Sequence, residues 1–181
     1  MAFKPSVRIA APPHPVTVRA AEPSDAAALV ALARGVAREP EGWLLVDDGW
    51  RSVADERRYL RAVRRSRSAA VIVAVDPAGT PIGRLSIARD PHPSSPHVAD
   101  VGLIVAIDHR RRGVGSALLR AAESWACTQG VAKIELHVFP HNTAAIGLYE
   151  RAGYEREGLR RAHYRRPDGR LVDAILMAKL L

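Results

Sequence analysis

Several features that would assign the chain to a class of protein are scarce or missing. One cysteine, Cys127, stands among 181 residues, so the chain forms no internal disulfide. No apolar run approaches the roughly 20 residues that a membrane-spanning helix requires. The composition, 48% hydrophobic and 25% charged, is instead that of an ordinary globular protein. We therefore expect a fold built around a hydrophobic core, with Cys127 as a packing residue of a helix.

Lysine is also scarce, and the basic charge is almost all arginine. The 27 basic residues comprise 24 arginines and 3 lysines, and with 19 acidic residues they give a net charge of +8. Such a surplus favours anionic partners, which include nucleic acid, a membrane surface and a phosphorylated cofactor. Charge alone does not choose among these partners.

The N-terminal segment lacks the pattern of a signal peptide. Pro5, Pro12, Pro13 and Pro15 oppose regular structure there, and no unbroken apolar stretch precedes a cleavage site. We expect a flexible leader over residues 1–15, a single domain over residues 16–181, a cytoplasmic location and no membrane partner.

The periodicity of apolar residues predicts a chain that mixes strands and helices. Helices are predicted within 22–39, with Ser24 as N-cap, and within 52–66, 113–130 and 142–153. Strands are predicted at 16–21, 68–75, 82–89, 98–107 and 132–139, with a closing hairpin over 154–166 and 170–181. These roughly seven strands and four helices predict an α+β fold with α/β/α layers.

A turn rich in arginine and glycine joins the fourth predicted strand to the third predicted helix. Three arginines, residues 110–112, precede Gly113 and Gly115. Glycines at a helix start let backbone N–H groups approach a phosphate, and the helix dipole and the arginines favour an anion there. The chain has no Gly-Lys-Ser/Thr of a Walker loop, and Leu118 stands where a dinucleotide fingerprint requires its third glycine. The pattern R-x-x-G-x-G therefore predicts a diphosphate-binding turn.

This pattern resembles the acetyl-CoA pyrophosphate-binding motif Q/R-x-x-G-x-G/A of the GNAT superfamily of N-acetyltransferases. The segment NTAAIGLYERAGY, which begins 27 residues after Gly115, is similar to that family's N-x-x-A-x-x-L-Y-E-x-x-G-F/Y segment. The opening VTVRAAEPSDAAAL resembles the family's first strand and helix. The closing segment from residue 159 resembles the branch that contains ribosomal-protein alanine N-acetyltransferases and several small-amine acetyltransferases.

The resemblance implies an open, splayed mixed sheet that binds acetyl-CoA between its fourth and fifth strands, without a metal. Backbone groups of the fourth strand would pair with the pantetheine arm, and the turn would hold the diphosphate. Three neighbouring arginines cannot all face the phosphates, so we expect at least one to face the adenosine end or solvent. The residues expected to bind the cofactor are Leu103, Ile104, Val105, Arg110, Arg111, Arg112, Gly113, Val114, Gly115, Ser116 and Asn142.

Acetyl transfer to an amine requires an acid for the leaving thiolate and a route for the proton of the amine. Tyr149 stands where the family keeps a tyrosine as the acid. His137 takes the position of a glutamate in the alanine-acetyltransferase branch, and an imidazole pKa of about 6.5 suits a base. Asp100 is a second candidate base, while Glu135 lies farther from the turn on the strand face of His137. A third alternative is no dedicated base, with solvent taking the proton.

We therefore expect an N-acetyltransferase that moves the acetyl group of acetyl-CoA to a primary amine by direct attack in a ternary complex. The acceptor would be a small molecule such as an amino acid, a metabolite or a drug, bound by residues 38–52, 90–97 and 160–170. One alternative is a protein N-terminus or an aminoacylated RNA as acceptor. Another is a non-catalytic acyl-CoA-binding sensor.

Two further partners follow less directly from the sequence. The arginine clusters 57–67 and 160–166 could assist RNA binding, but Tyr59 and Tyr164 are the aromatic residues that interleave them, which makes nucleic acid a weak alternative. A homodimer through the edge strands of the closing hairpin is compatible with the sequence.

Overall fold

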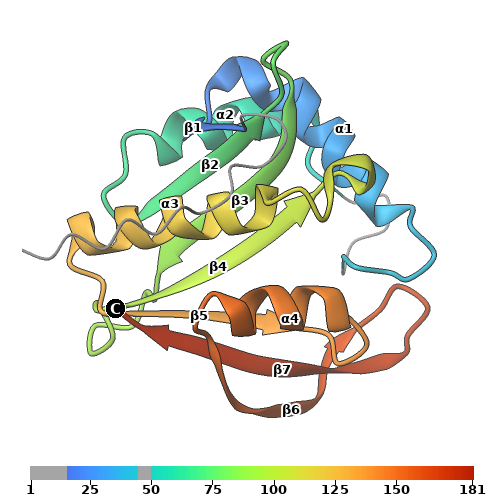
Figure 1. Ribbon diagram of the computed structural model, residues 1–181, viewed down its shortest axis with the longest axis vertical. Helices are drawn as coiled ribbons and strands as arrows, with labels where there is room; N and C mark the ends of the chain where they lie inside the picture. The colour runs from blue at the N-terminus through green and yellow to red at the C-terminus, as the bar shows by residue number, and fades with distance from the viewer. Residues whose placement is uncertain (1–15, 45–49) are drawn as a thin grey trace, which may run out of the picture.

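The computed structural model describes residues 16–44 and 50–181, which form one seven-stranded sheet in the order β1-β2-β3-β4-β5-β7-β6 (Figure 1). Neighbouring strands are antiparallel except for β4 and β5, which are parallel. The strands are β1 (Thr17–Ala20), β2 (Ala69–Val75), β3 (Pro81–Arg89), β4 (Val98–Val105), β5 (Lys133–Val138), β6 (Glu155–Arg165) and β7 (Leu171–Leu180). The helices of this described part are α1 (Ala26–Ala37), α2 (Val53–Val63), α3 (Val114–Gln129) and α4 (Thr143–Arg151). The predicted mixed α+β fold is confirmed, and the leader expected at 1–15 lies outside the described residues.

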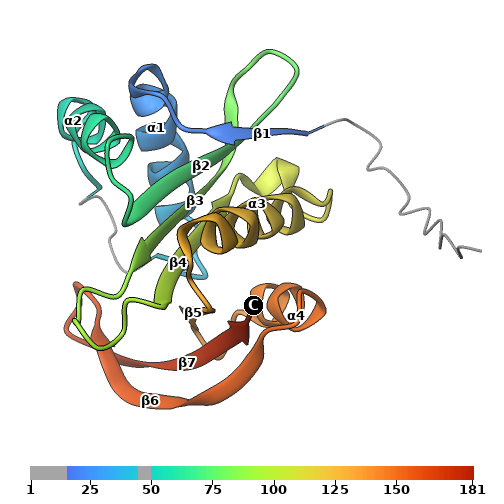
Figure 2. The same cartoon turned by 90° about the vertical axis from the view of Figure 1, so that its left-hand side faces the viewer.

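The helices cover the two faces of the sheet as separate layers. Helices α1 and α2 lie against one face, and α3 and α4 lie against the other (Figures 1 and 2). On the first face Leu29 and Leu60 pack in one core cluster with Val73 of β2. On the second face Leu118 and Ile146 belong to the larger core cluster. This arrangement gives the α/β/α layers that the periodicity predicts.

Strands β4 and β5 are joined at only one end. Their parallel register ends at Asp100↔Glu135, although β4 continues to Val105 and β5 to Val138. Along the remainder, β4 stays paired with β3 and β5 stays paired with β7. The two strands therefore diverge beyond Asp100, and the edge of β4 that faces β5 has no strand partner there.

The start of α1 differs from the prediction. Ser24 is not its N-cap, because Ser24 lies within a short 3-10 turn, Pro23–Asp25, and α1 begins after that turn. Asp25 is the N-cap residue of α1, but its carboxylate caps the preceding 3-10 turn, where it accepts from the backbone N–H of Glu22 at 2.7 Å. It also accepts from the guanidinium of Arg19 at 2.7 and 2.9 Å. A carboxylate accepts from a charged donor and from the backbone together, which a serine hydroxyl does less strongly.

The side of α3 that faces away from the sheet is open to solvent. Cys127 lies on this side as an exposed free cysteine, so the packing role predicted for it is wrong. Its neighbour Ala126 is the residue that packs in the core, and one step along an α-helix turns the side chain by about 100°. No helix within residues 16–44 and 50–181 is both long and apolar enough to cross a membrane.

Candidate active site

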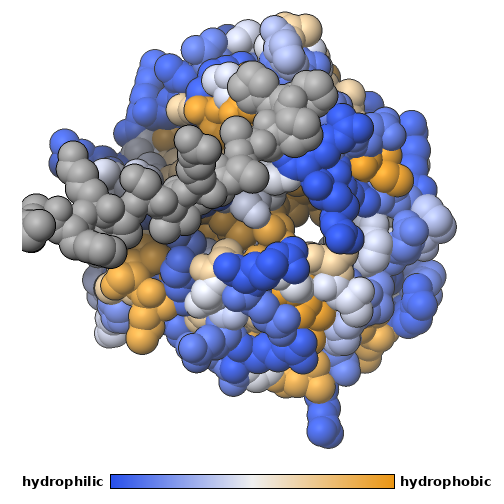
Figure 3. Space-filling view, in the orientation of Figure 1, coloured by the Kyte–Doolittle hydropathy of each residue, from blue (hydrophilic) through white to orange (hydrophobic). Residues whose placement is uncertain are grey.

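Two cavities meet where β4 and β5 diverge. The front cleft, of about 440 Å³, lies on the face covered by α3 and α4, and Figure 3 shows the molecule hollowed on that face. The rear cavity, of about 270 Å³, lies toward the opposite face. Trp43, Asn142, Ala145 and Tyr149 line both of them. The gap in the sheet is therefore a passage that ligands can enter from opposite faces.

The start of α3 presents backbone N–H groups to the front cleft. Gly113 is the N-cap residue, with a left-handed φ of 83°, and no side chain of the described residues caps the helix there. The N–H groups of Val114, Gly115 and Ser116 have no acceptor within the helix, because these are its first three residues. Gly113, Gly115 and Ser116 line the cleft. An uncapped helix start of this kind suits an anion.

Gly115 also lets α4 lie close to the start of α3. A Cβ atom at this position would lie 2.8 Å from Cδ2 of Leu148 and 3.7 Å from Cδ2 of Leu103. Both leucines line the front cleft. Any side chain at position 115 would therefore push against the apolar wall of the cleft.

The three arginines of the turn take different positions. The guanidinium of Arg110 is bound within the protein, where it donates to the carbonyl of Val105 at 3.0 Å and to Glu39 at 2.6 and 2.7 Å. Arg111 lines the front cleft, with a backbone φ of 60°. Arg112 is exposed and is not among the described residues that line the cleft. Arg110 lines the cleft as well, but its guanidinium is engaged by Val105 and Glu39, so Arg111 is the arginine lining the cleft that has no such bond among the described residues.

The end of β4 forms one wall of the front cleft. Leu103 and Val105 line the cleft, whereas Ile104 packs beside the core cluster on the opposite face. The edge of β4 in this stretch has no strand partner, so its backbone groups face the gap. An extended ligand carrying amide groups can pair with such an edge.

Tyr149 and Asn142 lie where the two cavities join. Tyr149 is 6% exposed, and burial raises its pKa to about 12. The phenol therefore keeps its proton at neutral pH. The side-chain oxygen of Asn142 caps α4 by accepting from the backbone N–H of Ala145 at 3.1 Å. Its side-chain nitrogen has no hydrogen-bond partner among the described residues and is free to bind a ligand in the passage.

Asp100 is the carboxylate of the rear cavity. Solvent reaches its side chain through the open mouth of the cavity, yet protein atoms crowd the carboxyl group. This loss of solvation raises the pKa of Asp100 to about 6, the charge of Glu135 adds to the rise, and Arg160 opposes it. At pH 7 Asp100 is mostly ionised, and it is a stronger base than an ordinary carboxylate.

His137 lies beside Tyr164, a residue of the segment 160–170 that was expected to bind the acceptor but was not singled out as a site residue. The Nδ1 atom of His137 lies 2.6 Å from the hydroxyl of Tyr164, and both residues line the rear cavity. Burial lowers the pKa of His137, and the charges of Arg160 and His163 lower it further. The imidazole is therefore neutral at pH 7 and a weaker base than a free histidine.

A stack of three rings lies beside the passage. The ring of His141 lies between Trp43 and Phe139, with both centroid separations at 5.5 Å. The guanidinium of Arg166 lies 4.8 Å from the centre of Phe139 and donates to the carbonyls of Gly42 and Leu44 at 2.6 and 3.2 Å. These contacts tie the turn between β6 and β7 to the segment that follows α1.

The rear cavity draws on two of the three segments expected to form the acceptor pocket. Trp43 and Leu44 come from the first and Tyr164 from the third, whereas no residue of 90–97 is among the described residues that line it. Residues 45–49, part of the first segment, lie outside the described residues.

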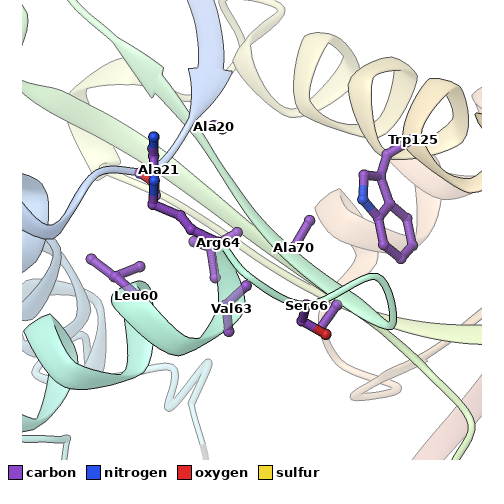
Figure 4. A pocket seen from close by; sticks show the side chains of 10 residues that line it. Ala20, Ala21, Leu60, Val63, Arg64, Ser66, Ala70 and Trp125 are labelled. Atoms are coloured by element: carbon purple, nitrogen blue, oxygen red, sulfur yellow. The ribbon is translucent and has the colours of Figure 1, made fainter. Parts of the chain in front are cut away.

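A third cavity, also of about 270 Å³, lies away from the passage between the end of α2, strands β1 and β2, and Trp125 (Figure 4). Among the described residues that line it, Arg64 is the ionisable one, and its guanidinium donates to the carbonyl of Ala21 at 3.0 Å. Acid and base groups therefore gather in the passage and not here. Within residues 16–44 and 50–181, no group of three or more His, Cys, Asp or Glu side chains is placed to hold a metal ion.

The splayed sheet, the glycine turn before α3 and the tyrosine between two cavities define one class of protein. Residues 33–154 match the model of the acetyltransferase (GNAT) family, and the chain belongs to that family. The resemblance stated from the two sequence motifs is confirmed.

Relatives of known name lie in the same family. The chain is 38% identical over 106 residues to the L-amino acid N-acetyltransferase AaaT of Escherichia coli (strain K12), an alignment that covers 56% of this chain and 63% of that protein. It is 44% identical over 71 residues to the [Ribosomal protein bS18]-alanine N-acetyltransferase of Escherichia coli (strain K12), covering 39% of this chain and 47% of that protein. The aligned part is thus less than two thirds of either relative.

The fold is also that of a solved structure with a bound cofactor. The phosphinothricin acetyltransferase from Sinorhizobium meliloti in complex with AcCoA superposes with a TM-score of 0.80 over 92% of this chain and 88% of that chain. The sequence identity is 20%, so this likeness concerns the fold.

Proposed function

We propose that the chain transfers the acetyl group of acetyl-CoA to a primary amine of a small molecule, by direct attack within a ternary complex. The observation that carries this proposal is the passage through the sheet. Its front cleft has an anion-binding helix start, its rear cavity has Asp100 and His137, and Tyr149 lies between them. The cofactor enters from the front and the amine from the rear, so the two reacting groups meet beside Tyr149.

The residues of the front cleft fit acetyl-CoA. The uncapped N–H groups at the start of α3 and the side chain of Arg111 suit its diphosphate. The unpaired edge of β4 and the nitrogen of Asn142 suit the amides of its pantetheine arm. Acetyl-CoA supplies an acetyl group activated as a thioester, and the solved relative from Sinorhizobium meliloti is named as a complex with it.

Tyr149 and Asp100 divide the proton transfers of the reaction. As the nitrogen–carbon bond forms and the carbon–sulfur bond breaks, Tyr149 donates its phenolic proton to the leaving sulfur. An ammonium acceptor loses two protons in all. One of these protons returns to the Tyr149 phenolate. Asp100 takes the other proton and passes it to solvent through the opening of the rear cavity. Asp100 suits the role of base better than His137, because its surroundings strengthen it as a base while those of His137 weaken that imidazole.

An amino acid fits the rear cavity well as an acceptor. Asp100 can bind its ammonium group, and the nearby charge of Arg160 favours its carboxylate. Phe139 and Leu44 offer apolar walls to a side chain. The relative from Escherichia coli with 38% identity is named as an L-amino acid N-acetyltransferase. The cytoplasmic location and the homodimer stay predictions.

An assay of CoA thiol release over a panel of amino acids, other small amines and short peptides tests the proposal. We expect a small amine to stimulate release, and Tyr149→Phe to lower kcat by about a hundredfold because the acid is lost. Tyr154→Phe is the matched control. The Tyr154 hydroxyl is buried and has no hydrogen-bond partner among the described residues, so its removal should leave the rate unchanged.

The same assay separates the alternatives. If peptides alone stimulate release, the acceptor is a protein N-terminus. One relative is named as an alanine N-acetyltransferase of a ribosomal protein. Tight CoA binding without release by any amine would make the chain an acyl-CoA sensor. Acceptance of aminoacylated RNA, with affinity that falls steeply with salt, would assign the RNA-linked reaction.

A further inference from the structure

One carboxylate links the diphosphate turn to the wall between the two cavities. Glu39 follows α1, and its side chain is 10% exposed. Its Oε1 and Oε2 atoms accept from the two terminal nitrogens of Arg110 at 2.6 and 2.7 Å. Oε2 also accepts from the indole Nε1–H of Trp43 at 2.8 Å. Arg110 opens the R-x-x-G-x-G turn, and Trp43 lines both cavities, so Glu39 joins parts of the site that bind different ligands.

Arg110 extends this link to β4. Its Nε atom donates to the carbonyl of Val105 at 3.0 Å, while its terminal nitrogens form the paired bonds to Glu39. A planar guanidinium that makes paired bonds to a carboxylate fixes orientation as well as distance. The end of α1, the end of β4 and the turn before α3 are therefore held in one arrangement.

We propose that Glu39 is a positioning residue for acetyl transfer, acting through Arg110 on the diphosphate turn and through Trp43 on the wall of the rear cavity. This inference rests on the proposed function, which supplies the two ligands. It also assigns the first arginine of the motif to the scaffold of the site, leaving Arg111 to face the diphosphate.

The sign of one effect separates positioning from simple electrostatics. Glu39 places a negative charge close to a site for an anion, so charge alone predicts that its removal strengthens CoA binding. If Glu39 holds the turn in shape, its removal weakens CoA binding instead. Glu39→Gln tests this sign, because it removes the charge while keeping the size of the side chain.

Calorimetric titration of the full chain with CoA is the measurement. We expect Glu39→Gln to raise the Kd by about tenfold, through loss of the paired charged hydrogen bonds. Glu41→Gln is the matched control. It removes the same charge from an exposed side chain that makes no hydrogen bond or ion pair within the described residues, and the Kd should stay within about twofold.

Two further variants test the route through each partner. Arg110→Lys keeps the charge but loses the paired geometry, so it should weaken CoA binding as Glu39→Gln does, and the double variant should be no worse than either single one. Trp43→Phe keeps a ring on His141 but loses the N–H. Because Trp43 lines both cavities, this variant should raise the KM for the amine several-fold and raise the Kd for CoA less than Glu39→Gln does.

The outcomes distinguish this inference from the proposed function. If the unaltered chain does not bind CoA, the proposed function fails. If it binds CoA and Glu39→Gln binds equally or more tightly, while near-ultraviolet circular dichroism shows both folded, the positioning role is overturned. Additive losses in the double variant would likewise overturn action through Arg110.

Discussion

Asp100 and His137 line one cavity, and the same physical cause shifts their pKa values in opposite directions. Loss of solvation penalises the charged form of each group, so the pKa of the carboxyl rises and that of the imidazole falls. Burial likewise raises the pKa of Tyr149, so the phenol keeps its proton. Near pH 7 the site therefore holds one anionic base, one neutral imidazole and one protonated phenol.

The pH dependence of activity should report Asp100. Because its pKa is raised to about 6, kcat/KM should rise with pH through about 6 as the proton leaves the carboxyl group. Asp100→Asn should remove this limb and lower kcat/KM about a hundredfold. The variant should unfold at a higher temperature than the unaltered chain at pH 7, because a carboxyl whose pKa is raised by folding destabilises the fold when ionised.

His137→Gln is the control for this pH profile. It removes the other candidate base, and the limb at about pH 6 should persist if Asp100 is responsible. Loss of the limb in His137→Gln, with its retention in Asp100→Asn, would assign the base to the histidine.

The first turn of helix α3 has to meet two structural requirements. The turn must leave its N–H groups open to a ligand, and it must let Leu148 of α4 lie against it. Gly115 meets both demands because it has no side chain. This close approach brings α4, which carries Tyr149, to the turn that we expect to hold the diphosphate.

Gly115→Ala should weaken CoA binding with little loss of stability. The new methyl group would meet Leu148 at 2.8 Å and force it into the front cleft, which should raise the Kd for CoA several-fold. The better helix propensity of alanine, up to about 1 kcal/mol, offsets the strain of that shift. Titration with CoA and thermal unfolding measure the two effects.

Gly35→Ala is the matched control for this element. Gly35 lies in α1 with open space where its Cβ would stand, so the substitution should raise the unfolding temperature and leave CoA binding unchanged. Equal CoA affinity in Gly115→Ala and Gly35→Ala would show that the contact with Leu148 does not shape the cleft.

Across the whole molecule, the sheet is two halves held together at one end of the β4–β5 pair. Strands β1 to β4 with α1, α2 and α3 form one half, and β5 to β7 with α4 form the other (Figure 2). A ligand in the front cleft contacts both halves, because the cleft is lined by α3 and α4 together. Binding should therefore stabilise the fold as a unit.

Thermal unfolding with CoA measures this stabilisation. At a CoA concentration a hundred times the Kd, the gain is about 2.7 kcal/mol, which for a chain of this size raises Tm by about 5 to 10 °C. Pantetheine, which lacks the diphosphate, is the control and should raise Tm much less at the same concentration. An equal shift with pantetheine would contradict a diphosphate site at the start of α3.

Local sequence was enough to predict the elements and to single out several residues that line the front cleft. Periodicity located the strands and helices, because a strand and a helix repeat over two and 3.6 residues whatever surrounds them. The residues Gly113, Gly115, Asn142 and Tyr149 line that cleft, and they could be singled out because they belong to short segments with fixed spacing. The start of α1 was missed because the 3-10 turn Pro23–Asp25 precedes the helix, and the carboxylate of Asp25 binds Arg19 and the backbone of Glu22 there.

The rear cavity and the contacts that hold the turn before α3 depended on segments that are distant in the chain. Glu39 and Arg110 meet although they are 71 residues apart in the chain. Tyr164 reaches His137 because β6 is irregular between Arg160 and Tyr164, where register with β7 shifts. Periodicity does not reveal such an irregularity, because it depends on how the partner strand is paired.

The proton affinities of the site also came from folding. The raised pKa of Asp100 results from protein atoms and a neighbouring carboxylate that the parallel pairing of β4 and β5 brings beside it. Spacing along the chain identified the glycine-rich turn before α3, because a helix start is local. Solvation and charge in the rear cavity depend on what the folded chain packs around each group.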